Sequence, residues 1–196
     1  MPVMDLAARL GGAARIETFK ADTVLFHRGD VTRHMFGVVD GQAYLRRTTI
    51  EGAEIVVHRA LGGDLFAEAA LFSSSYHCDG IAVAGARIAW FEKTALLDMM
   101  QTDGRFAVAF CRRIAGQVQR LRSNIELRAI RSAEDRIMAA LSLRLGEGET
   151  RYEPAGSWKG FAAEIGLTHE ALYRALKRLE QAKRLRRDGP VVELGV

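Results

Sequence analysis

Short runs of apolar and β-branched residues recur through the first hundred positions, separated by turns that contain glycine. The runs cover residues 23–27, 35–39, 42–47, 55–59 and 87–91. Gly29, Gly41, Gly52 and Gly63 follow one another at intervals of 12, 11 and 11 residues, each in a turn-like pair. Short strands with a turn signal at this spacing are typical of a sandwich or barrel. The pattern therefore predicts antiparallel β structure rather than a parallel sheet with crossover helices.

From about residue 94 the apolar spacing becomes that of helices. Thr94 is placed to cap a short helix that ends near Gln101, and Asp103 is placed to cap a longer one. Apolar residues recur along the longer helix at heptad spacing: Ala107, Cys111, Ile114, Val118, Leu121 and Ile125. A seam this narrow, flanked by arginines, favours a two-stranded coiled coil between two copies of the chain. The alternative is that this helix packs against the first half of its own chain.

The last third reads as helical and then briefly as β structure. Ser132 opens a predicted helix that runs to about Leu145, and a polar, loop-like stretch follows over residues 146–156. Two short helices are predicted over 157–164 and 168–182, joined by Ile165-Gly166-Leu167. A final run over 185–194 breaks at Asp188-Gly189, a strong signal for a tight hairpin. Two helices joined by a short turn that contains glycine form the helix-turn-helix pattern.

Composition narrows the class of protein. The 196-residue chain holds two cysteines, too few for a disulfide framework, and its longest fully apolar run (106–111) is too short to span a bilayer. Asp5 lies where a secretory signal would need apolar residues, so we expect a cytoplasmic protein with no membrane partner. The front half carries no phosphate-binding loop, nucleophile elbow or metalloprotease helix, and we expect no enzyme.

The net charge of +4 is unevenly distributed. Residues 1–101 hold 10 Lys and Arg against 12 Asp and Glu, whereas residues 102–196 hold 18 against 12. A basic back half is typical of a protein that binds a polyanion, although basic residues also solvate long helices. The imbalance thus favours two separate tasks for the two halves.

The second helix of the predicted helix-turn-helix carries side chains suited to reading double-stranded DNA. Thr168 is a good cap, and His169, Glu170 and Arg174 lie in the first two turns, which face the base edges when such a helix enters the major groove. Arginine pairs with guanine, and glutamate accepts from cytosine. The basic residues beyond them are suited to phosphates; in order these are Lys177, Arg178, Lys183, Arg184, Arg186 and Arg187.

These features together resemble the Crp/Fnr family of bacterial transcription regulators. Leu25–Asp30 and Val38–Gly41 look like the β-roll signatures of that family, and Gly63–Phe72 looks like its cyclic-nucleotide cassette. Gly166–Arg174, which includes Tyr173, looks like its recognition helix. The resemblance implies an α+β fold with a β-roll (jelly-roll) sensor over 1–101, a dimerisation helix over 102–130 and a winged helix-turn-helix over 131–196. It also implies a homodimer on a near-palindromic operator and a contact with RNA polymerase.

The predicted effector pocket departs from the family pattern. The arginine and serine that hold the cyclic phosphate align with Cys78 and Asp79, and the glycine before the cassette glutamate aligns with Ala67. Glu68 is retained, while the polar pair that contacts the adenine falls on or near Leu121 and Arg122. A neutral thiol cannot replace a guanidinium, and the adjacent carboxylate repels a phosphate. These replacements argue against cyclic AMP as the effector, and the effector stays unknown.

Two other effector chemistries stay open. His77 and Cys78 are adjacent and could ligate haem iron or a soft metal, and Cys111 lies on the predicted seam, where a redox role is conceivable. A buried free cysteine is also a common small apolar residue. A four-cysteine iron–sulfur cluster is excluded by the cysteine count. A rival function is a cyclic-nucleotide-type regulatory module that acts through protein contacts; an enzyme that uses Cys78 or His77 is remote, because no catalytic partners accompany them.

Overall fold

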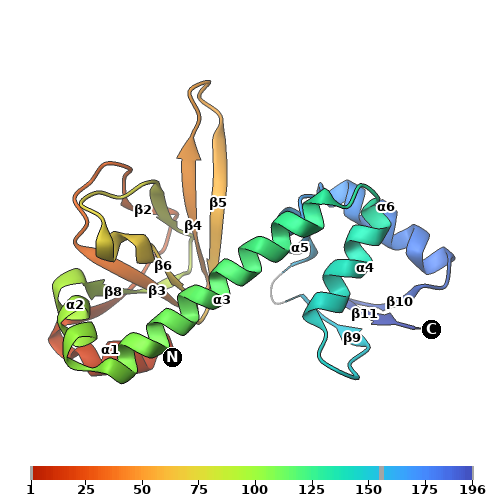
Figure 1. Cartoon of the computed structure of the whole chain (residues 1–196). Helices are drawn as coiled ribbons and strands as arrows, with labels where there is room; N and C mark the ends of the chain where they lie inside the picture. The colour runs from red at the N-terminus through yellow and green to blue at the C-terminus, as the bar shows by residue number, and fades with distance from the viewer. Residues whose placement is uncertain (1, 155–156, 196) are drawn as a thin grey trace. The chain divides into compact units, whose positions relative to one another are not determined.

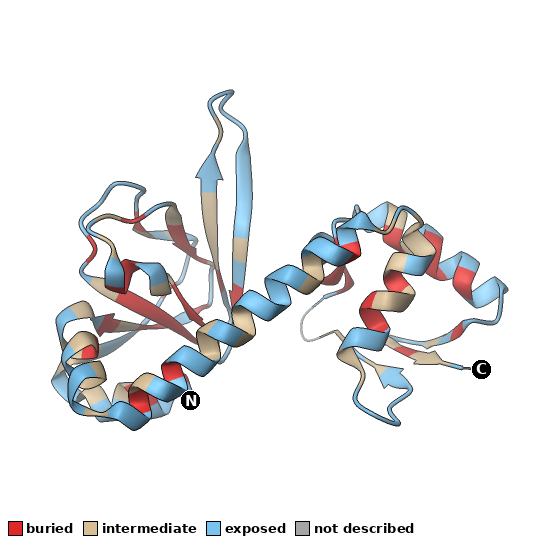
Figure 2. Ribbon diagram, in the orientation of Figure 1, coloured by how far each residue is buried: buried red, intermediate tan, exposed pale blue. Residues whose placement is uncertain are grey.

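The computed structural model describes residues 2–154 and 157–195, so positions 155 and 156 of the predicted loop lie outside the described residues. The chain forms two compact units, Met1–Arg112 and Arg113–Val196 (Figure 1). Buried side chains gather in a separate core within each unit (Figure 2). The boundary falls inside helix α3 (Gly104–Ala129), so the long helix contributes residues to both units. The division into three functional segments stays a prediction.

The first unit contains two four-stranded antiparallel sheets, as the glycine-punctuated pattern predicts. One sheet has the order β1 (Ala14–Thr18), β8 (Arg87–Glu92), β3 (His34–Asp40) and β6 (Leu65–Phe66). The other has the order β2 (Thr23–Phe26), β7 (Asp79–Ala82), β4 (Gln42–Thr48) and β5 (Glu54–Leu61). Figure 1 shows β4 and β5 extending as a long hairpin beyond the other strands. Each of the five predicted runs overlaps a strand, and β1, β6 and β7 are additional.

Short helices complete the first unit: α1 (Val3–Leu10), η1 (Gly11–Ala13), η2 (Glu68–Phe72) and α2 (Lys93–Thr102). Helix α1, which the sequence analysis did not predict, buries Val3 and Leu6 against the roll. The capping role expected of Thr94 is wrong, because α2 already begins at Lys93 and its N-cap residue is Glu92. Thr94 therefore lies inside the first turn of α2, where its hydroxyl does not cap the helix.

Aromatic side chains fill the interior of the roll. The Phe66 and Phe36 rings lie 5.3 Å apart, Phe36 and Phe26 5.1 Å, and Phe26 and Tyr76 3.9 Å, all three pairs stacked. Gly80 makes room for this stack, because a Cβ atom at position 80 would lie 2.3 Å from the Phe26 ring. The Tyr76 hydroxyl donates to the His34 carbonyl oxygen at 2.7 Å, which fixes the outer end of the stack.

The second unit contains α4 (Ala133–Arg144), α5 (Trp158–Glu164), α6 (His169–Gln181) and a small antiparallel sheet of order β10 (Leu185–Asp188), β11 (Val191–Leu194) and β9 (Arg151–Tyr152). Ser132, predicted to open its helix, and Thr168, predicted to cap its helix, each accept a hydrogen bond from a backbone N–H in the first turn, and Ser157 does the same for α5. Asp103 likewise accepts from the N–H groups of Arg105 and Phe106 at the start of α3. The order helix, turn, helix and hairpin is therefore confirmed; strand β9 falls in the stretch expected to be a loop.

Candidate nucleic-acid interface and effector region

The turn between α5 and α6 has the geometry that its glycine predicts. Gly166 adopts φ +71°, a conformation that favours glycine. A Cβ atom there would also lie 3.0 Å from Cγ of Arg128. The Leu167 N–H donates to the Ala162 carbonyl oxygen at 2.8 Å, which closes the turn. The positive φ therefore favours glycine at position 166, and a side chain there would also require the Arg128 side chain to shift.

Helix α6 separates its apolar side chains from the residues predicted to contact DNA. Leu172, Ala175, Leu176 and Leu179 are buried, together with Phe161, Ala162 and Ile165 of the preceding segment. The polar face is exposed and carries His169, Glu170, Arg174, Lys177 and Arg178. Tyr173 is half-buried at the edge of the core. The predicted contact residues other than Tyr173 thus lie on the exposed side of one helix, with the capping Thr168 exposed at its start.

Acidic side chains at the start of α4 face the basic side of α6. Arg178 pairs with Glu134 at 2.9 Å, and this hydrogen bond lowers the pKa of the Glu134 carboxyl. Arg184 pairs with Asp135 at 3.2 Å. A groove of about 210 Å³ between the two helices is lined by Ala133, Glu134, Ala171, Arg174, Ala175 and Arg178. Arg174 forms no ion pair within the described part of the chain.

The hairpin β10–β11 is attached to α6 through aromatic and cationic contacts. The Arg187 guanidinium lies 5.3 Å from the centre of the Tyr173 ring, which in turn makes an edge contact with His169 at 4.7 Å. The Arg187 N–H donates to Glu180 at 3.3 Å. Arg186 pairs with Glu193 across the hairpin at 2.6 Å. Of the basic residues expected to grip phosphates, Arg178, Arg184, Arg186 and Arg187 therefore have intramolecular partners, whereas Lys177 and Lys183 are exposed.

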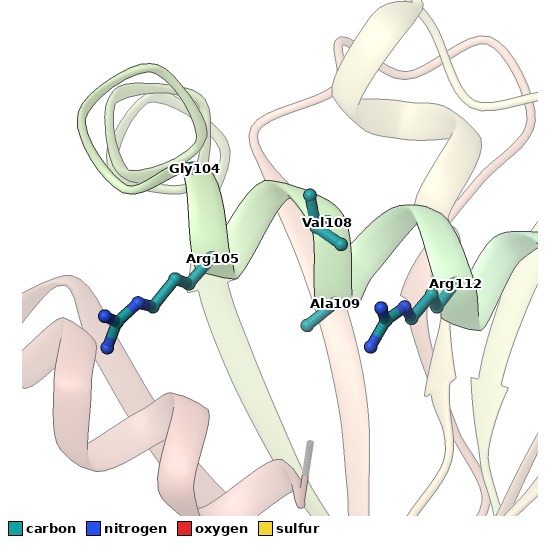
Figure 3. Close-up of a pocket in the computed structure, with 5 residues that line it drawn as sticks. All are labelled: Gly104, Arg105, Val108, Ala109 and Arg112. Atoms are coloured by element: carbon teal, nitrogen blue, oxygen red, sulfur yellow. The ribbon is translucent and has the colours of Figure 1, made fainter.

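The apolar seam predicted on the long helix is largely exposed. Val118 retains 40%, Leu121 59% and Ile125 69% of its accessible surface; Cys111 is exposed and Ile114 is half-buried. Near the start of α3, a shallow depression of about 450 Å³ is lined by Gly104, Arg105, Val108, Ala109 and Arg112 (Figure 3). Its lining comes from one helix, so it is an open surface on which Val108 is also exposed.

The predicted cassette region of the roll places Ala67 and Glu68 at the start of a short 3-10 helix, close in sequence to Cys78 and Asp79. Ala67 adopts φ +59° immediately before η2, in the left-handed region that favours glycine, and Glu68 begins η2. Asp79 accepts a hydrogen bond from the Arg28 N–H at 2.8 Å, and its carboxylate lies 3.6 Å from the Arg46 guanidinium. The carboxylate aligned with the phosphate-binding serine is thus already paired. Leu121 and Arg122 belong to the second unit, so their participation in this pocket stays a prediction.

Cys78 and His77 have different surroundings although they are adjacent. Burial raises the pKa of the Cys78 thiol, while Arg47 opposes this shift. His77 is exposed, and its Nε2 lies 3.2 Å from Oγ of Ser73. Within the described residues, no group of three or more His, Cys, Asp and Glu side chains is arranged to hold a metal ion. The structure therefore adds no further ligand to the His77 and Cys78 hypothesis.

Comparison with known proteins identifies the class of the first unit. The family model described as cyclic nucleotide-binding domain matches residues 16–103.

None of the described helices combines the length and apolar character needed to cross a membrane. No curated protein matches the sequence.

Solved structures extend the likeness to nearly the whole chain. FixK2 from Bradyrhizobium japonicum is 19% identical, with 93% of each chain covered and a TM-score of 0.66. CLP from Xanthomonas campestris, described as a c-di-GMP responsive global regulator, is 20% identical, with 98% of this chain and 100% of that chain covered and a TM-score of 0.65. CprK in complex with OCPA is 18% identical, with 98% and 90% covered and a TM-score of 0.76. The resemblance to Crp/Fnr-type regulators is thereby confirmed at the level of the fold.

Proposed function

We propose that the protein is a sequence-specific DNA-binding transcription regulator of the Crp/Fnr type, active as a homodimer and controlled by a signal other than cyclic AMP. The observation that carries the proposal is the exposed face of α6. Glu170 and Arg174 are exposed on this face, whereas the apolar side chains of the helix are buried. A helix capped at Thr168 and braced by a hairpin presents its first turns to a major groove. Glu170 and Arg174 are the proposed base-reading pair.

A regulator of this kind binds two half-sites, which requires two copies. The exposed seam of α3 offers a surface for a second copy, since Val118, Leu121 and Ile125 follow heptad spacing and retain 40%, 59% and 69% of their accessible surface. A parallel pair of these helices would bury the seam and place the two α6 helices in symmetric positions. The likeness to FixK2, CLP and CprK supports this assembly. Contact with RNA polymerase stays a prediction from the resemblance.

The charges around Cys78 and Asp79 bear on which effector the roll would bind. Cys78 supplies no positive charge, and Asp79 adds a negative one that Arg46 and the Arg28 N–H already engage. An anionic ligand therefore lacks the partner that the family's cyclic phosphate uses. A haem, metal or redox signal at His77 and Cys78 is a second candidate, favoured by their adjacency, and ultraviolet–visible absorbance with metal analysis of anaerobically purified protein tests it.

The experiment that tests the DNA function is selection of duplexes from a random pool, followed by titration of the selected operator and a scrambled duplex. We expect Arg174→Ala to abolish the preference for the operator, since a lost base contact costs about 1–3 kcal/mol. Lys183→Ala is the matched control, because Lys183 is exposed outside the proposed reading face. It should weaken binding to both duplexes equally and lower the slope of log affinity against log salt by about one.

Two outcomes would contradict the proposal. Wild-type protein that selects no sequence, or that binds duplex DNA without dependence on salt, would favour the rival regulatory module acting through protein contacts. An Arg174→Ala variant that retains full discrimination would remove α6 as the reading element.

A further inference from the structure

The guanidinium of Arg136, in the second unit, donates all of its hydrogen bonds to backbone carbonyl oxygens. The Arg136 guanidinium makes five hydrogen bonds: Nε to the Ile130 oxygen at 2.9 Å, one terminal nitrogen to Ile165 at 3.3 Å and Gly166 at 3.1 Å, and the other to Arg128 at 3.3 Å and Ile130 at 2.6 Å. A guanidinium has five N–H donors, so each has one partner. Arg136 forms no ion pair among the described residues.

The four carbonyl groups belong to the ends of two helices. Arg128 and Ile130 lie at the C-terminal end of α3, and Ile165 and Gly166 follow the last residue of α5. The final carbonyl groups of a helix lack partners within it and carry partial negative charge. Arg136 therefore caps two helix ends at once with a single positive charge. These bonds are charge-assisted, which makes each of them stronger than a neutral hydrogen bond.

Packing reinforces the same connection. The side chain of Arg128 lies against Gly166, leaving about 3.0 Å between its Cγ and the position of a Cβ atom. Leu127 is buried in the core of the second unit, and Ile130 packs against that core. The last turn of α3 and the turn before α6 are thus joined by Arg136, by Arg128 and by shared apolar contacts. Of these, only Arg136 reaches both ends through hydrogen bonds.

We infer that Arg136 is a positioning residue, which holds the turn before α6 to the last turn of α3 and so fixes the orientation of the reading helix relative to the long helix. The effect on operator preference rests on the proposed DNA function. The effect on hydrogen exchange of backbone amides rests on the structure alone. Arg136 itself contacts no DNA in this account. Its loss should reduce discrimination between duplexes while leaving the number of phosphate contacts unchanged.

The test compares Arg136→Gln and Arg136→Lys with the matched control Arg144→Gln. Arg144 lies on the same helix and pairs with Glu164 of α5 at 2.9 Å, so this control removes the same charge from α4 away from α3. Affinities for the selected operator and the scrambled duplex are measured over a salt series. Residue-level hydrogen exchange is followed at the amides of Ile130 and Leu167, which flank the Arg136 contacts, and at Leu194 in the small sheet.

For Arg136→Gln we expect a loss of about tenfold or more in operator preference, the equivalent of one charge-assisted hydrogen bond, with an unchanged salt slope. Exchange at Ile130 and Leu167 should accelerate about tenfold, while Leu194 exchanges as in the wild type. Arg136→Lys retains the positive charge but has three N–H donors in place of five. It should show the same changes in operator preference and exchange to a smaller extent. The test therefore remains valid if Arg136→Gln does not fold. Arg144→Gln should change neither the operator preference nor exchange at Ile130.

Three results would overturn the inference. A salt slope lowered by about one in Arg136→Gln would make Arg136 a phosphate contact. Equal acceleration at Ile130, Leu167 and Leu194 would make its role one of general stability. Unchanged exchange at all three amides would mean that Arg136 holds nothing in place. If the wild type selects no operator, the proposed function fails while the exchange measurement still decides the role of Arg136.

Discussion

Both units of this chain have the fold of Crp/Fnr-type regulators, but their predicted sites differ in the side chains that they carry. In the second unit, the side chains suited to reading DNA lie on the exposed face of α6, and the cap, the turn and the hairpin that support them are all present. In the first unit, the roll and the left-handed position before η2 are present, but the positions predicted to bind a cyclic phosphate hold the Cys78 thiol and the Asp79 carboxylate, which is already paired. The side chains proposed for DNA are therefore in place, whereas those expected for a cyclic phosphate are replaced.

The largest effect should come from the apolar seam of α3, which the proposed homodimer requires for operator binding. In Leu121→Glu, a paired seam would bury an unpaired charge from each copy, at a cost of about 3–5 kcal/mol each. We expect the variant to be monomeric by sedimentation velocity and to lose operator binding, with each unit still folded.

Leu143→Glu is the matched control for the seam, because Leu143 on α4 is 60% exposed and Leu121 is 59% exposed. It should behave as the wild type in sedimentation and in DNA binding. A Leu121→Glu variant that remains dimeric, or a wild type that is monomeric at every concentration, would remove the seam from the account.

A smaller effect should come from Gly80→Ala, which we expect to destabilise the roll of the first unit and to leave the second unit unchanged. The added Cβ atom would lie 2.3 Å from the Phe26 ring, which also stacks on the Tyr76 ring at 3.9 Å. Overpacking of this kind costs about 1–3 kcal/mol. Thermal unfolding followed by hydrogen exchange should show weaker protection of β2 and β7 with α6 unchanged.

Gly12→Ala is the control for Gly80→Ala, since a Cβ atom at Gly12 meets nothing within 4 Å. It should leave the unfolding temperature of the roll unchanged. Equal effects of the two substitutions would show that the aromatic stack does not depend on the space at position 80.

The smallest effect concerns pH. Burial, assisted by Arg15 and Arg33, lowers the pKa of His34 below its ordinary value of 6.5, while Glu92 opposes the shift. Protonation is therefore less favourable in the folded roll than in the unfolded chain, so the stability of the roll is full above pH 6.5 and declines as the pH falls through the lowered pKa. His34→Gln should flatten this decline in urea unfolding between pH 7 and pH 5, whereas the exposed His77→Gln should not. Identical pH profiles for both variants would contradict this assignment.

Local signals allowed much of the second unit to be predicted from the sequence. Ser132 and Thr168 lie at the starts of the helices that they were expected to open and to cap, and Gly166 lies in the expected turn between α5 and α6. These features depend on neighbouring residues only, so the sequence pattern contains them. The capping role of Thr94 failed because α2 follows β8 directly and its N-cap is Glu92, two residues before Thr94.

Features that depend on distant contacts were not predictable in the same way. Asp79-Gly80 has the composition of a turn, yet it begins strand β7, which pairs with β2 and β4, and the glycine leaves room for the Phe26 ring. An alanine carries no signal of its own for the left-handed conformation that Ala67 adopts, and the glycine of the resembled family at this place was the one hint of it. The role of Arg136 depends on carbonyl groups up to thirty positions away, and an isolated arginine on a helix gives no indication of such partners.

The most direct test of the central contrast is the fluorescence anisotropy of a labelled operator duplex, titrated with the protein in the presence and absence of cyclic AMP. We predict selective, salt-dependent binding with the same affinity in both titrations, because the proposed reading residues lie on α6 and the predicted effector pocket has Cys78 where the family's arginine is expected. Operator binding that appears only when cyclic AMP is added would contradict this prediction.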